Sequence, residues 1–407
     1  MRKSGVAFVV VVACFALVAL ALPARAQCSY GSYEIVYAQP ISGNSNLFVS
    51  CGTSLQTTNV SAILGVYTSS SSQFTGWTIS SSQFGIAFQG PGGHLLEALY
   101  TAGTGWTEAD LTAAAGGTAA VLGTPLGSFT DGHGQHVFYF GTDGSVHQML
   151  YSGSSWANQT LAAAGSIYSE SKLAAYEYNS TEFVVYEGSG GDVRLLSFNG
   201  SSWTNTNLTT ATGGEVPMNG TAFTGIDSVS PNSAQLIYFV GADGNVHEYS
   251  EVDGQWSDHA VVVSGLPKPA PNGQLVFYVV DEGGATYDYY VSYLTGPYSY
   301  DGADGFEIFA AYRPDDTYSW NAIDVTTQGG EPNPTALNVT LGGVSTGIPD
   351  YVYFSGNQAG STPPPSVTLL IPSDGLWHAT SSALLSSYDI AEGTVVVPLA
   401  SFQWLGS

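Results

Sequence analysis

Short aromatic and β-branched segments alternate with Gly-containing turns along most of the chain. Residues 135–156 show the pattern: an apolar strand, a turn at Asp143-Gly144, a second apolar strand and a further turn before Trp156. An Asp-Gly pair supplies the positive φ angles that a tight hairpin turn needs. The pattern predicts an antiparallel β-hairpin that ends on a tryptophan.

This unit recurs at a period typical of a four-stranded propeller blade. Three copies place a His or Arg nine residues before the tryptophan, and a looser copy precedes them. Successive tryptophans are 50, 47 and 53 residues apart, at Trp106, Trp156, Trp203 and Trp256. Blades of this length are four-stranded sheets that pack mainly on their neighbours, so we predict an all-β protein with the β-propeller fold.

Weaker copies of the unit flank the four clear ones. They contain Trp77, Trp320 and Trp377. We therefore expect about seven four-stranded blades, with six possible if a terminal unit is incomplete. An apolar strand at residues 394–397 is expected to complete the ring with N-terminal strands near residues 33–37. No segment shows sustained helical periodicity, because the Ala runs at 113–115 and 162–164 are short and flanked by Gly.

The first 26 residues read as a secretory signal peptide. A basic start precedes an apolar run over residues 6–22, and Ala24 to Ala26 fits a small-x-small cleavage site. A retained membrane anchor is the alternative, but a run of 17 residues is short for a membrane span. We predict one propeller domain over residues 27–407, secreted to the extracellular space (or the periplasm of a bacterium), with no membrane span after the signal is removed.

Cysteine content fits an oxidising compartment. Cys28 and Cys51 are the two cysteines beyond the signal, and a disulfide between them would close a loop of 24 residues. Such a bond contributes about 3 kcal/mol to stability. Two unrelated thiols are the alternative.

Charge excludes several partners. Beyond residue 26 the chain has four basic residues against 32 acidic ones, a formal net charge of −28. Such a surface repels phosphate backbones and anionic lipid, so nucleic acid and membrane surfaces are disfavoured as partners.

The hairpin from Asp243 to Trp256, DGNVHEYSEVDGQW, gives the best match to a known family. It resembles the blades of fucose-specific lectins and their relatives, and the resemblance covers residues 83–258 well and the remainder weakly. It implies that a sugar-binding Glu stands at Glu248, with Gln148 and Glu97 as its repeat equivalents. The Arg that pairs with this Glu in the lectins is replaced here by Leu236, His136 and Phe183. The resemblance therefore implies the fold, and it does not imply fucose as the ligand.

Candidate ligand-binding residues follow from the repeat. The four tryptophans could stack on the apolar faces of sugar rings, although sealing each blade against the next is the favoured role. His147 and His247, with Gln148 and Glu248 beside them, could bond ligand hydroxyls. Adjacent strand residues face opposite ways, so only one of each pair can face a given junction, and structural histidines are an equal alternative.

Other chemistry is weakly indicated. Arg194 is the basic residue of the repeat set and could bind an anionic group, but a lone surface Arg is the commoner finding. His133, His136 and His147 lie close in sequence without the spacing of a known metal motif, so neither a metal nor a cofactor is expected. The sequence contains no H-E-x-x-H motif.

These patterns favour a secreted, non-catalytic, lectin-like β-propeller with repeated weak carbohydrate sites between blades. Glycans or polysaccharides would be its partners. A glycoside hydrolase or lyase acting on polysaccharide is the first alternative, and a scaffold without a ligand is the second. A hydrolase would need a carboxylate pair, which 32 acidic residues permit without identifying it.

Overall fold

The structure is a computed structural model that describes residues 33–41, 44–51, 56–227, 235–263, 266–270, 275–283, 286–300, 303–314, 319–325, 340–344, 351–356, 366–373, 376–381 and 397–403. The predicted signal peptide lies outside the described residues. So do Cys28 and the side chain of Cys51, so the disulfide stays a prediction.

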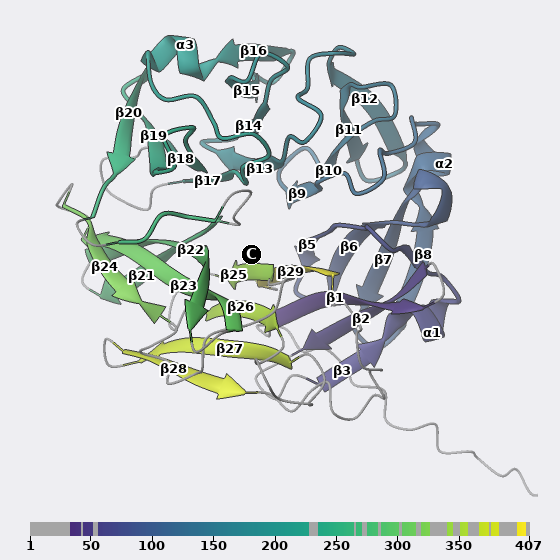
Figure 1. The fold of residues 1–407 in the computed structure, drawn as a ribbon. Helices are drawn as coiled ribbons and strands as arrows, with labels where there is room; N and C mark the ends of the chain where they lie inside the picture. The colour runs from purple at the N-terminus through teal and green to yellow at the C-terminus, as the bar shows by residue number, and fades with distance from the viewer. Residues whose placement is uncertain are drawn as a thin grey trace, which may run out of the picture.

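The described strands form seven antiparallel sheets arranged around a common centre (Figure 1). The first sheet has the order β29 (Val397–Gln403), β1 (Tyr33–Ile41), β2 (Asn44–Cys51) and β3 (Gln56–Asn59), with β4 (Thr68–Ser69) also paired to β2. The second consists of β5 (Phe74–Ser80), β6 (Gln83–Gln89), β7 (Leu95–Thr101) and β8 (Gly105–Asp110). The third consists of β9 (Gly127–Thr130), β10 (Gln135–Phe140), β11 (Val146–Tyr151) and β12 (Trp156–Ala162).

The remaining four sheets repeat this up-and-down order. The fourth has β13 (Leu173–Tyr178), β14 (Thr181–Glu187), β15 (Val193–Phe198) and β16 (Trp203–Asn207). The fifth has β17 (Thr224–Asp227), β18 (Gln235–Val240), β19 (Val246–Val252) and β20 (Gln255–Val261). The sixth has β21 (Leu275–Gly283), β22 (Thr286–Tyr300), β23 (Ala303–Pro314) and β24 (Asn321–Asp324). The seventh has β25 (Thr340–Val344), β26 (Tyr351–Gly356), β27 (Ser366–Ser373) and β28 (Leu376–Ser381).

The innermost strands close a ring. β5, β9, β13, β17, β21, β25 and β29 each contact the next in turn, and β29 returns to β5. Closure occurs within the first sheet, where β29 pairs antiparallel with β1 and places Ala400 opposite Val36. The predicted all-β propeller and its closing pair of terminal strands are thus confirmed. The closing strand is described from Val397 onward, and residues 394–396 lie outside the described part.

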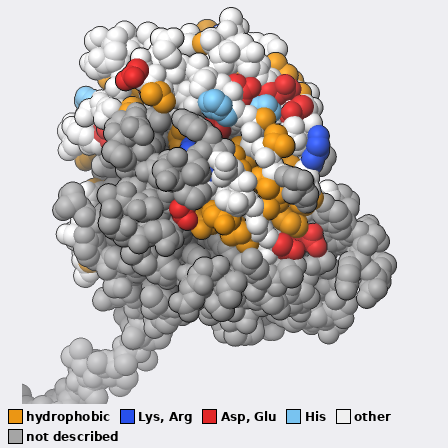
Figure 2. Space-filling view, turned by 90° about the vertical axis from the view of Figure 1, so that its left-hand side faces the viewer, with side chains coloured by type: hydrophobic (Ala, Val, Ile, Leu, Met, Phe, Trp, Pro, Cys, Tyr) orange, Lys and Arg blue, Asp and Glu red, His pale blue; other side chains and the backbone are white. Residues whose placement is uncertain are grey.

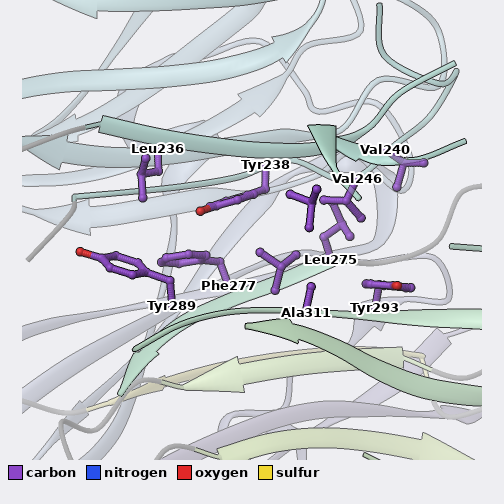
Figure 3. Packing of buried hydrophobic residues seen from close by; sticks show 11 residues of the cluster. Leu236, Tyr238, Val240, Val246, Leu275, Phe277, Tyr289, Tyr293 and Ala311 are labelled. Carbon is purple, nitrogen blue, oxygen red and sulfur yellow. The ribbon is translucent and has the colours of Figure 1, made fainter. Parts of the chain in front are cut away.

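The hydrophobic core is divided into slices between neighbouring sheets. Figure 3 shows the slice between the fifth and sixth sheets, where Tyr238 of β18 faces Phe277 of β21 and Tyr289 of β22. The rings of Tyr238 and Phe277 stack with their centroids 4.8 Å apart. Both faces of a central strand are therefore buried, which explains the continuous apolar runs in the sequence.

A buried hydroxyl fixes the end of the second strand in four successive sheets. The backbone N–H of Phe140, the last residue of β10, donates to Thr124 Oγ1 at 2.9 Å, and that of Val240 donates to Thr221 Oγ1 at 2.9 Å. The equivalent acceptors in the second and fourth sheets are Ser72 and Ser171. This repeat was not recognised in the sequence, because single Ser and Thr residues are common in this chain.

Replacing Thr124 with valine should lower the free energy of unfolding by about 1–3 kcal/mol. Valine keeps the shape but leaves the buried Phe140 N–H without its acceptor. Urea denaturation of the variant measures the change, and Thr107→Val, at an exposed position of β8, is the control. Equal stability of Thr124→Val and the parent protein would show that this anchor does not stabilise the blade.

Short helices follow the outer strand of three sheets. They are α1 (Val60–Leu64), α2 (Leu111–Ala115) and α3 (Leu208–Thr212), and a 3-10 turn, η1 (Pro91–Gly93), joins β6 to β7. In α2 the Asp110 side chain accepts from the Ala113 N–H, and Gly116 ends the helix at a φ of 59°. The Ala run at 113–115 is thus helical, and its caps outweigh the short length. Ala162, by contrast, ends β12.

The described surface carries few cations. Figure 2 shows acidic side chains distributed over one side of the molecule, whereas few Lys or Arg side chains reach it. Within the described residues, no helix has the length and apolar character to cross a bilayer.

Candidate functional site at the junction of two sheets

The four repeated tryptophans pack between their own sheet and the preceding one. Trp156 meets Trp77 of the second sheet edge-on, with ring centroids 6.4 Å apart, and Trp203 meets Phe138 of the third sheet at 6.2 Å. Trp106 packs in the same way between the first and second sheets, and Trp256 packs between the fourth and fifth. All four are partly buried, so each seals a junction. Stacking of their remaining exposed surface on a sugar stays a prediction.

His147 and His247 fasten the central hairpin turn to its sheet. His147 Nε2 lies 3.0 Å from Asp143 Oδ1, and His247 Nε2 lies 3.3 Å from Asp243 Oδ1. His247 Nδ1 also lies 2.8 Å from Asp258 Oδ1. Burial alone would lower the pKa of His247, but Asp258 and Asp243 raise it above its ordinary value. These contacts fit the structural role for both histidines, and their ligand role is still a prediction.

Gln148 and Glu248 point from their strands toward the following sheet. Only 2% of Gln148 and 1% of Glu248 is exposed. Gln148 Nε2 donates to Glu182 Oε2 of the fourth sheet at 2.9 Å. Arg313 Nη2 of the sixth sheet donates to Glu248 Oε2 at 3.1 Å. At both predicted sugar-binding positions, the polar group is therefore engaged by a neighbouring sheet.

Arg313 belongs to a buried polar group between the fifth and sixth sheets. Tyr238 Oη donates to Glu248 Oε2 at 2.6 Å, and the guanidinium lies 4.9 Å from the Tyr289 ring centroid and 5.3 Å from that of Trp320. Burial alone would lower the pKa of Arg313, but Glu248 and Tyr238 raise it, so the guanidinium stays charged. These contacts hold the ion pair between two sheets.

Glu97 and Arg194 are the remaining predicted residues. The predicted equivalence of Glu97 with Gln148 is wrong, because Glu97 lies nine residues before Trp106, as His147 does before Trp156, and so stands at the His147 position. Glu97 is buried in β7, and burial raises its pKa to about 7. Arg194 is 33% exposed, and its Nη2 lies 2.6 Å from Asp192 Oδ2 on the same hairpin. Arg194 is therefore paired with a neighbouring carboxylate and not a lone surface Arg, and its role toward an anionic ligand stays a prediction.

A polar cluster lies at the junction of the third and fourth sheets, around Gln148. His136, fully buried in β10, places Nε2 2.8 Å from Asp131 Oδ1 and Nδ1 3.2 Å from Glu182 Oε2. His133 Nδ1 lies 3.0 Å from Asp131 Oδ2 and 3.6 Å from Glu182 Oε1. Burial alone would lower the pKa of His136, but both carboxylates raise it. The cluster thus joins two sheets through two carboxylates and two imidazoles.

Local structure sets the positions of these groups. Asp131 stands at the start of the loop from β9 to β10 and accepts backbone N–H bonds from His133 at 2.7 Å and Gly134 at 3.1 Å. Across the junction, β13 turns into β14 at Asn179-Ser180, whose positive φ angles of 48° and 58° are those of a tight hairpin turn. That turn brings Glu182, the second residue of β14, opposite the loop.

Aromatic rings border the cluster where it reaches the surface. The His133 side chain is 49% exposed. Its ring stands edge-on to Phe198, with centroids 6.1 Å apart, and Phe198 packs on Trp203 at 5.4 Å. A half-exposed imidazole beside partly buried aromatic rings combines polar and apolar surface, as sugar recognition requires. We call His133, Phe198 and Trp203 the aromatic rim.

A separate pocket opens between the same two sheets at the opposite end of β10. Its volume is about 180 Å³, and Glu170 and Lys172 are its charged lining residues. Its walls are otherwise largely apolar, with Leu122 66% exposed. The junction thus has a pocket at one end, and the aromatic rim, with the polar cluster behind it, at the other.

The ring of antiparallel sheets defines a β-propeller. Comparison with solved structures identifies the same fold. No protein-family model matches the chain, and no curated protein matches it in sequence. A lectin from Burkholderia pseudomallei has a TM-score of 0.60 at 15% identity, covering 88% of this chain and 100% of that chain. AofleA from Arthrobotrys oligospora has a TM-score of 0.52 at 14% identity, covering 83% and 90%.

A fungal lectin from Aleuria aurantia is also similar. Its TM-score is 0.51 at 18% identity, covering 77% of this chain and 96% of that chain. That lectin is described as a six-bladed β-propeller with a fucose recognition mode. The likeness confirms that the blades of this chain have the fold seen in fucose-binding lectins.

Sequence reasoning missed the partners that neighbouring sheets supply. Glu182 and Arg313 come from sheets other than those of Gln148 and Glu248, 34 and 65 residues away. Glu182 stands at the repeat position that Gln83, Gln135 and Gln235 occupy in the other sheets, a signal that was overlooked. Arg313 lies in the sixth sheet, beyond the clear copies of the repeat. His133 and His136 were noticed as neighbours in sequence, but the carboxylates that hold them were not.

Proposed function

We propose that this protein is a secreted, non-catalytic lectin-like β-propeller whose principal carbohydrate site is the aromatic rim between the third and fourth sheets. The observation that carries the proposal is the half-exposed His133 standing edge-on to Phe198. A pyranose presents an apolar face that can pack on an aromatic ring and hydroxyls that can bond an imidazole.

Other features support this assignment. The chain shares the fold of lectins, one of which is described by its recognition of fucose. Its acidic charge disfavours phosphate-bearing partners, whereas uncharged glycans are unaffected by it. The fucose-lectin Arg position is His136 in the third sheet, which is fully buried, so we expect the sugar to be held by other contacts than an Arg at this position. Weaker sites at the other junctions would add avidity toward a multivalent glycan.

Replacing Phe198 with alanine should weaken glycan binding about tenfold, because it removes the aromatic face beside His133. Tyr151→Ala is the matched control: Tyr151 packs on Trp156 at 5.4 Å, the same separation as Phe198 and Trp203. Calorimetric titration with the tightest ligand of a glycan panel measures both variants. Equal losses in the two variants would contradict a principal site at this rim, and release of new reducing ends from a polysaccharide would indicate an enzyme instead.

A further inference from the structure

Three side chains with metal-binding atoms converge at the aromatic rim. Asp131 and His133 belong to the third sheet and Glu182 to the fourth. Each residue offers one ligand atom, and the three atoms lie within 4.8 Å of one another. The two carboxylates are nearly fully buried, with 5% and 3% of their side chains exposed, whereas His133 is half-exposed. Two buried carboxylates are costly unless cations or donors compensate them, and here two imidazoles, His133 and the fully buried His136, face the pair.

Each carboxylate divides its oxygens between two roles. Asp131 Oδ1 is held by the His133 N–H, the Gly134 N–H and His136 Nε2, whereas its Oδ2 faces His133 Nδ1. Glu182 Oε2 accepts from Gln148 Nε2 and lies beside His136 Nδ1, whereas its Oε1 faces His133 Nδ1. One oxygen of each is therefore oriented by outer groups and the other is presented to the histidine, as in metal sites with an ordered outer shell.

The two separations from His133 to the carboxylate oxygens suit a small tetrahedral ion, and the two carboxylates offer oxygen atoms within 4.8 Å of each other. His133 Nδ1 lies 3.0 Å from Asp131 Oδ2 and 3.6 Å from Glu182 Oε1. Ligands bound to zinc at 2.0–2.1 Å in a tetrahedron stand about 3.3 Å apart, between these two values. Imidazole nitrogen with carboxylate oxygen is a zinc donor set, and three protein ligands leave a fourth position for water or another ligand.

We propose that Asp131, His133 and Glu182 form a zinc site at the aromatic rim, with His136 and Gln148 orienting the two carboxylates. Two carboxylates and a neutral imidazole balance the charge of Zn²⁺. The acidic surface raises the local concentration of cations. Bound zinc would tie the third sheet to the fourth, because Glu182 is the one ligand of the three from the fourth sheet.

A second cluster in the described residues provides a contrast. Glu215, Asp243 and His247 also bring three metal-binding atoms together. There Lys268 Nζ donates to the backbone carbonyl of Asp243 at 2.6 Å, and His247 is held by Asp258 as well. The Asp243 side chain is 37% exposed, against 5% for Asp131, so solvent screens it more and this cluster is expected to bind zinc more weakly.

The test is calorimetric titration of zinc chloride into the untagged, EDTA-treated and dialysed mature protein at neutral pH. We expect one site with micromolar or tighter affinity and a higher melting temperature in the presence of zinc. Cobalt substituted at the same site should give visible absorption bands of a tetrahedral complex. Glu182→Gln and His133→Ala should each weaken zinc binding at least tenfold.

His94→Ala is the matched control. His94 is 47% exposed and lies 2.7 Å from Asp110, so it repeats the exposure and carboxylate contact of His133 at another hairpin. Zinc binding should be unchanged in this variant. The proposal is overturned if the parent protein binds no zinc at 100-fold excess over protein, or if His133→Ala binds zinc as the parent does. His133→Ala alters a half-exposed side chain, so it remains informative if Glu182→Gln fails to fold. Because zinc binding is read without any glycan, its failure is separable from failure of the carbohydrate proposal.

Discussion

Arg313→Ala should lower the free energy of unfolding by about 3–5 kcal/mol, the range observed when one partner of a buried ion pair is removed. The substitution leaves the Glu248 carboxylate, 1% exposed, with its charge uncompensated between the fifth and sixth sheets. It also removes the guanidinium from the rings of Tyr289 and Trp320. Urea denaturation followed by tryptophan fluorescence measures the loss.

Arg194→Ala is the control for this experiment. Arg194 also pairs with a carboxylate, Asp192, but its side chain is 33% exposed and its partner lies on the same hairpin. Surface pairs of this kind contribute about 0–1 kcal/mol. The double variant Glu248→Gln/Arg313→Met should recover much of the stability, because it removes both charges together. An Arg313→Ala protein as stable as Arg194→Ala would show that the ion pair does not join the sheets.

Glu97→Gln should become increasingly stabilising, relative to the parent protein, as the pH rises from 4 to 8. Burial raises the folded-state pKa of Glu97 to about 7 from an ordinary 4.5, so folding favours its neutral form. The stability that this neutral form contributes is complete below pH 4.5 and is lost as the pH rises through about 7. At 1.36 kcal/mol for each pKa unit, the difference between variant and parent should change by up to about 3 kcal/mol.

Chemical denaturation of both proteins across this pH range measures the change. Glu108→Gln, on an exposed side chain of the adjacent strand β8, supplies the baseline. If the difference in free energy of unfolding between Glu97→Gln and the parent stays constant from pH 4 to pH 8, the pKa of Glu97 is not raised in the folded protein.

The fold was accessible from sequence because its signals are local and repeated. Asp143-Gly144 and its counterparts specify hairpin turns within a few residues, and Trp106, Trp156, Trp203 and Trp256 mark the outer strands of the second to fifth sheets. The assignment of Trp77 to the first unit was wrong, because Trp77 lies in β5, the innermost strand of the second sheet. The structure places Gly144 at a φ of 75° and Trp156 at the start of β12, as that pattern predicts. The pairing of β29 with β1 could also be predicted. In a closed ring of sheets, the first and last strands of the chain pair with each other and leave no exposed edge.

The site was less accessible because its contacts cross between sheets. The spacing that placed Gln148 and Glu248 at a sugar position holds in the structure, since they stand opposite Phe138 and Tyr238 at equivalent places. Each is buried against a residue of the following sheet, Glu182 or Arg313, and a repeat within one sheet does not indicate which residues of two sheets meet. The short helices were not predicted because five residues show no helical periodicity. In α2 a capping Asp110 and a terminal Gly116 stabilise the helix despite its length.

The most direct test of the account is a glycan array probed with the mature protein, followed by calorimetry on the best ligand. We expect binding at millimolar or lower ligand concentration, and binding about tenfold weaker when Phe198 is replaced with alanine. Absence of binding to every glycan at millimolar concentration would contradict the carbohydrate-binding role.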